Sequence, residues 1–347
     1  MSDEINYNRK IETDDAEPKA LEQVAGELAS GNFYSLMPDT VLASVEEAGA
    51  RTTGLCYALN SLENRVYEIE LEDRSRVVAK FYRPGRWSFD AIMDEHRMLA
   101  ALVDQEIPCC APTPFSDGET IHTTQDGIFF SIFPKIGGRS PDELHSAHDH
   151  YAQIGRLLAR IHNVGAGIEL KHRPDISPKV YGTDRLELIL SKASIAPGVS
   201  ARYVAAVQAL VVLGDQMYRG VECIPLHGDC HRANLLHDQQ WFFLDFDDMG
   251  IGPAVQDLWL LLPGRASECA AELEQMLEGY EQFREIDPGT IRLIELLRGL
   301  RYVRYAGWVA ERWDDPAFKR AFPAWGSDRY WEGQTADVME QVALSTG

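Results

Sequence analysis

The sequence has few of the features that mark secreted or membrane proteins. Its six cysteines form no C-x-x-C pair, which argues against a disulfide framework or a zinc-binding motif and fits a reducing compartment. No uninterrupted apolar run reaches the roughly 18 residues that span a bilayer, and the acidic start of the chain shows no secretory signal. We therefore expect a cytoplasmic protein that does not enter a membrane.

Positive charge is also scarce. The chain has 33 Lys and Arg against 54 Asp and Glu, and its net charge of −21 opposes contact with a nucleic-acid backbone, which needs clustered cations. Nucleic acid is therefore not an expected partner, and we expect the chain to act as a monomer. An acidic surface could attract a cationic substrate, although solubility alone explains it more simply.

A glycine-rich G-x-G-x-x-G loop is absent. In its place, residues 59–67 read LNSLENRVY between two expected strands. Short polar side chains and backbone N–H groups at this point could cover phosphates, and Ser61 and Asn64 are the candidates. An ordinary polar hairpin turn explains either residue alone almost as well.

The 347 residues, 45% of them hydrophobic, suffice for two packed lobes. Residues 1–33 alternate charges with small residues and have little to bury, which predicts a mobile acidic arm. Residues 34–138 predict a β-rich lobe, and a glycine pair at its end separates it from the helical patterns of 139–347. The strand and helix patterns of the first lobe cover 58–60, 65–71, 76–82, 88–104 and 127–133. We expect an α+β fold in two lobes.

The most informative stretch is HGDCHRAN at residues 227–234, followed by the apolar strand WFFL and then DFDD. It places Asp229 five residues before Asn234 on a tight loop and puts Asp245 at the end of a short strand. This is the layout of a phosphoryl-transfer site. Asp229 would accept the proton of an attacking hydroxyl, while Asn234 and Asp245 would hold Mg²⁺ on ATP.

The same stretch could also be a simple turn or a transition-metal site. A lone H-G-D is mostly a capped turn, but the longer pattern is more specific. A transition-metal site would need convergent ligands, whereas the candidate ligands are mostly adjacent and lack a ligand spacing. These are His227, Asp229, Cys230, His231 and His237. Two points stay open: whether Asp247 or Asp248 shares the metal, and whether Cys230 is redox-sensitive or a buried inert thiol.

Further residues fit a nucleotide site by their order along the chain. VVAK at residues 77–80 ends a strand with Lys80, which could reach the α- and β-phosphates, and Glu95 one helix-length on could pair with it. The segment from Phe133 to Ile136 stands where a linker between lobes would offer backbone groups to adenine. Asp257 could support the catalytic loop by accepting its hydrogen bonds, or it could simply favour a helix N-terminus.

The order of these motifs resembles the aminoglycoside phosphotransferase and choline kinase superfamily. The resemblance runs from about residue 34 to 342 and is greatest to a bacterial branch of serine/threonine protein kinases that act in stress responses. The motifs that carry it are S-x-E-N-R-V-Y, V-A-K-F-Y-R-P, H-G-D-C-H-x-x-N, D-F-D-D and G-P-A-V-Q-D-L-W.

The resemblance implies a small β-rich N-lobe, a larger helical C-lobe and ATP in the cleft between them. It also implies that Asp229 is the proton acceptor, that Asn234 and Asp245 hold Mg²⁺, and that Ser61 lies at the ATP site. The chain reads D-F-D where protein kinases of the eukaryotic type read D-F-G, so the activation mechanism attached to that motif is not implied.

Three functions follow as hypotheses. The first is an ATP- and Mg²⁺-dependent serine/threonine protein kinase that acts on proteins, including itself. The second is a small-molecule kinase for an amino alcohol, sugar or aminoglycoside, for which an acidic pocket would suit a cationic acceptor. The third, a nucleotide-binding regulator without turnover, is disfavoured because Lys80, Asp229, Asn234 and Asp245 are all present.

Overall fold

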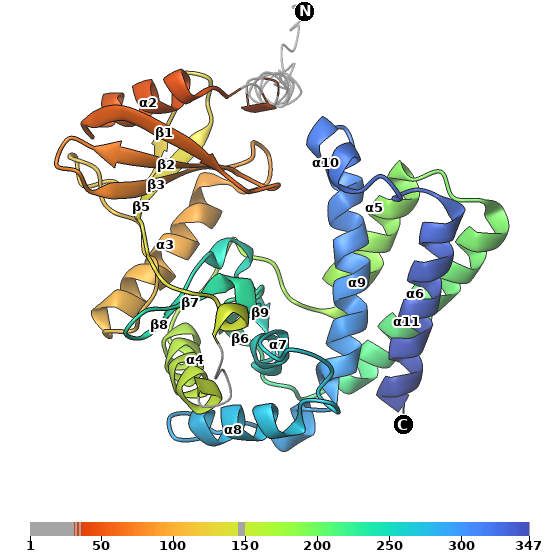
Figure 1. Cartoon of the computed structure of the whole chain (residues 1–347). Helices are drawn as coiled ribbons and strands as arrows, with labels where there is room; N and C mark the ends of the chain where they lie inside the picture. The colour runs from red at the N-terminus through yellow and green to blue at the C-terminus, as the bar shows by residue number, and fades with distance from the viewer. Residues whose placement is uncertain (1–30, 32, 35, 145–149, 347) are drawn as a thin grey trace, which may run out of the picture.

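The structure is a computed structural model that describes residues 31, 33–34, 36–144 and 150–346 (Figure 1). Most of the predicted arm of residues 1–33 lies outside the described residues. Phe33, which that prediction included, is fully buried against the sheet, with the guanidinium groups of Arg65 and Arg83 over its ring at 4.9 and 5.1 Å. The predicted boundary at residue 33 is therefore wrong for Phe33, which belongs to the packed β-rich lobe.

A five-stranded antiparallel sheet with the order β1-β2-β3-β5-β4 forms one part of the molecule (Figure 1). Its strands are β1 (Thr52–Leu59), β2 (Arg65–Leu71), β3 (Arg76–Phe81), β4 (His122–Thr123) and β5 (Phe129–Pro134). Alternate side chains of β2, β3 and β5 form a core with α2 (Pro38–Glu47), in which Phe81 and Phe130 stack at 5.0 Å. Because side chains alternate along a strand, Lys80 then points to the opposite face of the sheet.

Helix α3 (Phe89–Asp104) links this sheet to the rest of the molecule. Ser88 caps its N-terminus by accepting the Ala91 N–H at 3.1 Å, as Ser commonly does. Its apolar face, with Met98 and Leu102, packs into the large core of the helical part. The same helix carries the buried Glu95 toward the sheet.

The remaining chain is mainly helical and surrounds two short antiparallel strand pairs, β6 with β9 and β7 with β8. These strands are β6 (Ile224–Leu226), β7 (Leu235–His237), β8 (Trp241–Phe243) and β9 (Gly250–Gly252). The helices are α4 (Tyr151–Ala166), α5 (Asp184–Lys192), α6 (Pro197–Met217), α7 (Val255–Leu260), α8 (Ala270–Tyr280), α9 (Leu293–Glu311), α10 (Pro316–Ala321) and α11 (Asp328–Thr346). The shorter helical turns are η1 (Pro141–Glu143), η3 (Pro178–Thr183), η4 (Arg232–Asn234), η5 (Phe246–Asp248) and η6 (Pro288–Thr290).

Most predicted elements of the sheet are present, and the hairpin expected around residues 238–240 is confirmed as β7 and β8. The start of β1 was predicted six residues too late. Residues 52–57 are mostly exposed on a strand at the sheet edge, so they show little of the apolar alternation that identifies a strand.

Helix α6 is long and apolar enough, by length and composition alone, to cross a membrane, with a mean hydropathy of 1.3 over its best window. It was not predicted as such because Arg202 and Asp215 interrupt its apolar residues. In this structure α6 packs against α11, α9 and η3, with Tyr203 and Leu210 fully buried. Packing against other helices accounts for the buried third of this window, whereas Val212 on the same helix is 58% exposed.

Helices α4 and α8 approach closely where two glycines meet the backbone of the other helix. A Cβ atom on Gly279 would lie 2.0 Å from the carbonyl oxygen of Ala152, and one on Gly155 would lie 2.0 Å from that of Met276. Neither distance leaves room for a methyl group. The pair supports the base of the helical part (Figure 1).

We expect Gly279→Ala to lower the free energy of unfolding by about 1–3 kcal/mol, because the helices must move apart. The control is Gly333→Ala in α11, where nothing lies within 4 Å of the new methyl. That variant should be neutral or gain up to about 1 kcal/mol from helix propensity. Urea unfolding measures both, and equal effects of the two substitutions would contradict the close packing.

Candidate active site

The loop that carries Asp229 is held by its backbone. Gly228 has φ +81°, and a Cβ there would lie 2.3 Å from the carbonyl oxygen of Asp248, so only glycine fits. The fully buried carboxylate of Asp257 accepts the N–H groups of His227 and Gly228 at 2.8 and 2.9 Å. The hydrogen-bonding role predicted for Asp257 is confirmed, and it fixes the backbone on which Asp229 stands.

Asp229 itself faces two cationic or ionisable side chains. Its Oδ1 lies 2.6 Å from Nη1 of Arg301, and its Oδ2 lies 3.5 Å from Nε2 of His231. Burial raises the pKa of Asp229, but Arg301, His231 and Arg304 together outweigh it, so the pKa lies below its ordinary value. Asp229 is therefore ionised at neutral pH, as a proton acceptor must be. Sequence reasoning missed Arg301, which stands 72 residues downstream on α9 with no local motif.

Asp245 follows β8 and adopts a left-handed backbone conformation with φ +57°, which is uncommon outside glycine. Its Oδ1 lies 2.9 Å from Nζ of Lys80, and Oδ1 of Asp247 lies 3.1 Å from the same nitrogen. Burial lowers the pKa of Lys80, but these carboxylates and that of Glu95 raise it well above its ordinary value. The Lys80 ammonium thus stays charged between two aspartates of the D-F-D-D motif.

Glu95 forms the predicted ion pair with Lys80 and also has a second, nearer partner. It lies 3.9 Å from Nζ of Lys80, whereas Nη2 of Arg173 donates to its Oε2 at 3.0 Å. Arg173 also donates to the carbonyl oxygens of Ala91 and Asp247 at 2.7 and 2.6 Å. A buried arginine needs acceptors for its several N–H groups, and the carboxylate of Glu95 is one of the three that Arg173 uses. Arg173 was missed because it lies in a loop without a recognisable motif.

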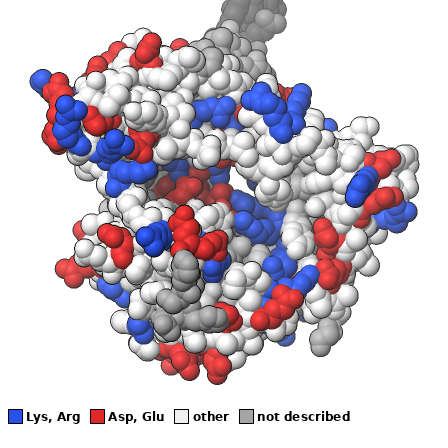
Figure 2. Space-filling model, in the orientation of Figure 1, with Lys and Arg blue, Asp and Glu red and all other residues white. Residues whose placement is uncertain are grey.

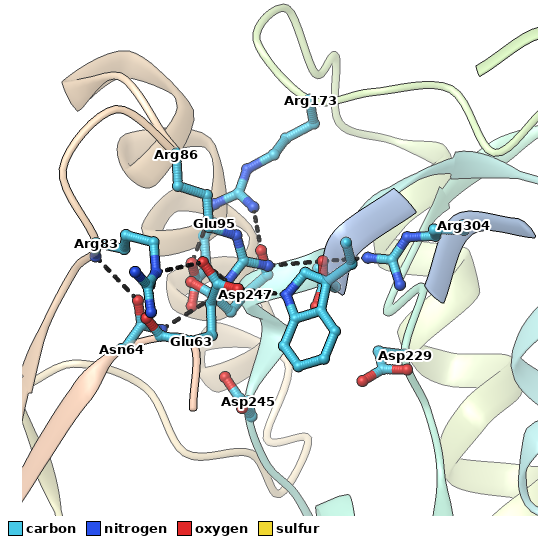
Figure 3. Close-up of polar contacts among 12 residues, drawn as sticks. Glu63, Asn64, Arg83, Arg86, Glu95, Arg173, Asp229, Asp245, Asp247 and Arg304 are labelled. Carbon is cyan, nitrogen blue, oxygen red and sulfur yellow. Dashed lines mark hydrogen bonds and ion pairs between the residues drawn. The ribbon is translucent and has the colours of Figure 1, made fainter. Parts of the chain in front are cut away.

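Asp247 and Asp248 are paired with cations from both sides of the site, and Figure 3 shows Arg86 and Arg304 on opposite sides of Asp247. Arg86 pairs with both carboxylates, and Arg304 of α9 pairs with Asp248. Burial alone would raise the pKa of each aspartate, but Arg86 and Lys80 lower that of Asp247, and Arg304 and Arg86 lower that of Asp248. Both carboxylates are therefore ionised.

Asn64 was predicted to cover a phosphate, and its side chain also takes part in this network. Its Nδ2 donates to Oδ2 of Asp247 at 3.2 Å, and its Oδ1 accepts the N–H of Arg83 at 3.2 Å. Its amide is thus used in both directions, and the side chain is nearly fully buried. Asn64 ties the turn after β1 to the D-F-D-D motif.

Two cavities meet at this motif. The first has a volume of about 320 Å³ and is lined by Asp245, the predicted Mg²⁺ ligand, and by every residue predicted to bind the nucleotide, namely Ser61, Asn64, Lys80, Glu95, Phe133 and Ile136. Apolar side chains complete its walls, among them Leu59, Val66, Val78, Leu244 and Phe246. The second, of about 640 Å³, contains Asp229 with Arg301, Arg304, Tyr305 and Trp308.

The two cavities share Asn60, Ser61, Asn64 and Asp245. Figure 2 shows this face hollowed between the sheet and the helices, with acidic and basic surface side by side in the hollow. Asn234 lines neither cavity. Its Nδ2 donates to the carbonyl oxygen of Asp229 at 3.0 Å, and its own carbonyl accepts the N–H of Leu244 at 2.9 Å. Asn234 therefore joins the Asp229 loop to the strand that precedes Asp245, and its role as an Mg²⁺ ligand stays a prediction.

This geometry agrees with the comparison to known proteins. The model of the phosphotransferase enzyme family matches residues 58–294. The chain belongs to this family. Stress response kinase A of Escherichia coli (strain K12) is 40% identical over 90% of this chain and 94% of the relative. A protein named serine/threonine protein kinase RdoA, from Salmonella typhimurium, is 39% identical with the same coverage. The chain is thus a phosphotransferase with a hydroxyl acceptor.

Solved structures confirm the predicted two-lobed fold class. Amicoumacin kinase hAmiN, in complex with AMP-PNP, Ca²⁺ and Ami, has a TM-score of 0.66 at 17% identity and covers 87% of this chain and 92% of its own. Choline kinase LicA from Streptococcus pneumoniae has a TM-score of 0.60 at 14% identity, covering 88% of this chain and 98% of its own. At these identities the likeness concerns the fold.

The transition-metal hypothesis for the phosphotransferase loop finds no support. Across residues 31, 33–34, 36–144 and 150–346, no group of three His, Cys, Asp or Glu side chains is placed to hold a metal ion. Cys230 is fully buried, and burial raises the pKa of its thiol well above the ordinary value. Of the two alternatives for Cys230, the structure therefore supports the inert thiol, because a redox-sensitive cysteine needs a thiolate that reagents can reach.

We expect Asp257→Asn to cost the phosphotransferase about 2–3 kcal/mol of stability and most of its activity, because the amide NH₂ meets a backbone N–H that loses its acceptor. Asp287→Asn is the control, since its exposed carboxylate accepts the Gly289 N–H at 2.8 Å, a bond that asparagine can also make. Urea unfolding and the initial rate measure the two effects. Wild-type activity in Asp257→Asn would show that the loop does not depend on this carboxylate.

Proposed function

We propose that this phosphotransferase is an ATP- and Mg²⁺-dependent serine/threonine protein kinase. The observation that carries the proposal is the position of Asp245 at the junction of the two cavities, with Lys80 on one side and Asp229 on the other. A terminal phosphate bound at this junction could be reached by a hydroxyl that is hydrogen-bonded to Asp229. Phosphoryl transfer depends on such positioning and on neutralising charge.

The first cavity fits a nucleotide. Its walls combine apolar side chains with the backbone of the segment from Phe133 to Ile136, which can accept and donate hydrogen bonds to a base. Lys80 lines this cavity, and its Nζ lies 2.9 Å from Oδ1 of Asp245, where an ammonium can neutralise phosphate oxygens. Ser61 lines both cavities, and its hydroxyl can donate to a phosphate oxygen.

Mg²⁺ fits the carboxylates that now surround the Lys80 ammonium. Oxygens of Asp245 and Asp247 both lie about 3 Å from its Nζ, so two hard ligands converge on one cationic position. Asp248 is less suited, because Arg86 and Arg304 already occupy its carboxylate. Mg²⁺ usually takes one or two carboxylates and completes its shell with phosphate and water, and it neutralises charge on the transferred group.

The residues of the chain then divide the reaction between them. The acceptor hydroxyl lies beside Asp229, and its oxygen forms the new bond to the γ-phosphorus while the bond to the β-phosphate bridging oxygen breaks. The proton passes to Oδ2 or Oδ1 of Asp229, and ADP leaves. Lys80 neutralises the phosphates, and Asp257 holds the loop so that Asp229 keeps its position.

Protein as the acceptor is supported by the relatives and by the second cavity. Both relatives of about 40% identity are named as kinases, and one is named a serine/threonine protein kinase. The cavity around Asp229 is twice the volume of the nucleotide cavity and lies in an open hollow (Figure 2). Autophosphorylation is part of the proposal, because the chain itself offers hydroxyls to an open cleft.

A small-molecule kinase is the second candidate, because neighbours of the same fold are named for small-molecule acceptors. Those neighbours are at most 18% identical, however. The acceptor cavity is lined by carboxylates as well as arginines, but Arg301 lies 2.6 Å from Asp229 and opposes a cation next to the reacting hydroxyl. A regulator without turnover is disfavoured, because Lys80, Asp229 and Asp245 converge in one place.

We expect Asp229→Asn to lower the rate of phosphate transfer by about two to four orders of magnitude, because the amide cannot accept the hydroxyl proton. Transfer from labelled ATP to a protein mixture and to the chain itself measures the effect. Asp238→Asn, on the exposed turn between β7 and β8, is the matched control and should behave as wild type. Equal transfer by Asp229→Asn and wild type would contradict the proposed role of Asp229.

We expect Asp245→Ala to abolish the part of the thermal stabilisation by ATP that requires Mg²⁺. In wild type, nucleotide at about 100 times its Kd should add roughly 2.7 kcal/mol, and omission of Mg²⁺ or addition of a chelator should remove most of it. Asp247→Ala and Asp248→Ala are measured alongside. An unchanged Mg²⁺-dependent shift in Asp245→Ala would assign the metal to one of the other two carboxylates.

A further inference from the structure

The ion pair between Arg301 and Asp229 is a feature that phosphate transfer alone does not require. Arg301 stands on α9, on the far side of the cleft from the nucleotide cavity, and its Nη1 lies 2.6 Å from Oδ1 of the proton acceptor. Its side chain is about a quarter exposed, with a relative accessibility of 25%. The acceptor side of the site thus holds a cation that an entering molecule can reach.

Arg301 and its neighbour Arg304 differ in how they are held. Arg304 lies over the ring of Tyr181 at 5.0 Å and pairs with Asp248, which Arg86 also binds. Within the described part of the chain, the one ion pair of Arg301 is the pair with Asp229. Arg304 is therefore fixed by several contacts, whereas Arg301 can exchange its one carboxylate for another.

An acceptor hydroxyl has to approach close to Arg301. A proton acceptor works within about 2.6–3.2 Å of the hydroxyl oxygen. Since Oδ1 of Asp229 is already 2.6 Å from Arg301, a hydroxyl bound to that carboxylate lies within roughly 6 Å of the guanidinium group. Groups that neighbour the hydroxyl in the acceptor therefore meet a positive charge, which repels an ammonium and attracts a carboxylate.

We propose that the acceptor is a serine or threonine hydroxyl within an acidic protein segment, and that Arg301 pairs with a carboxylate next to that hydroxyl. This inference rests on the proposed protein kinase function and names its substrate class. When the acidic segment binds, Arg301 moves from Asp229 to the incoming carboxylate and leaves Oδ1 free for the hydroxyl. The negative net charge of the chain does not by itself select a cationic acceptor, because the ion-pair partners of Asp229 in the described part of the chain are Arg301 and His231.

The chain's own sequence supplies a probe for this preference. Residues 11–18 read IETDDAEP, with Thr13 as the one hydroxyl among four carboxylates. Three synthetic peptides are compared as acceptors for the full-length enzyme with ATP and Mg²⁺: this sequence, a neutral form in which Glu and Asp become Gln and Asn, and a basic form with Lys at the same positions. The steady-state rate of phosphate transfer gives kcat and KM for each.

We expect wild type to prefer the acidic peptide over the neutral one by about tenfold or more in kcat/KM, mainly through KM, with the basic peptide poorest. Arg301→Gln should bring the ratio of acidic to neutral peptide close to one, and Arg301→Lys should retain part of the preference. Arg202→Gln is the matched control, since it removes an exposed arginine of α6 far from the cleft. Its ratio should equal that of wild type.

The results distinguish the role of Arg301 from the protein kinase function on which it rests. Peptide phosphorylation without an acidic preference, or with the preference unchanged in Arg301→Gln, overturns the role of Arg301 and leaves the protein kinase function standing. Absence of transfer to all three peptides contradicts the protein kinase function itself. Stabilisation of Arg301→Gln by MgATP equal to that of wild type shows that the variant is folded and that its altered ratio concerns the acceptor.

Discussion

The sharing of Asp247 and Asp248 between cations from the two parts of the molecule is the interaction on which the site depends. Lys80 and Arg86 come from the sheet side, and Arg304 comes from α9. Buried carboxylates are costly unless they are paired, so the sheet, the D-F-D-D motif and α9 are held in one mutual arrangement. Residues of this network line both cavities, Lys80 the first and Arg86, Arg304, Asp247 and Asp248 the second.

The same pairing prepares the site for its chemistry. Lys80 neutralises two aspartates that would otherwise repel each other, and phosphates with Mg²⁺ can replace that arrangement without leaving a buried charge unpaired. Arg301 does the equivalent for Asp229 on the acceptor side. Asp229, Asp245 and Asp247 are thus each paired with a cation that a ligand can replace, whereas Asp257 is buried with the backbone N–H groups of the loop and with His162 as its partners.

How far the sequence predicts this site depends on how local each signal is. Asp229, Asn234 and Asp245 stand in one short stretch, and Lys80 ends a recognisable strand, so their order indicates phosphoryl transfer and the fold class. Arg86, Arg173, Arg301 and Arg304 lie in loops or on α9 without a motif of their own. Their roles arise from tertiary packing, which also gives Glu95 a second partner in Arg173 and places Asn234 outside both cavities.

A crystal structure with Mg²⁺ and a non-hydrolysable ATP analogue tests the central claim most directly. We expect the base against the segment from Phe133 to Ile136, Mg²⁺ on Asp245 and Asp247, Lys80 on the phosphates, and the terminal phosphate facing Asp229. A nucleotide bound outside this cavity, or a terminal phosphate directed away from Asp229 while Lys80 stays on Asp245, would contradict this arrangement.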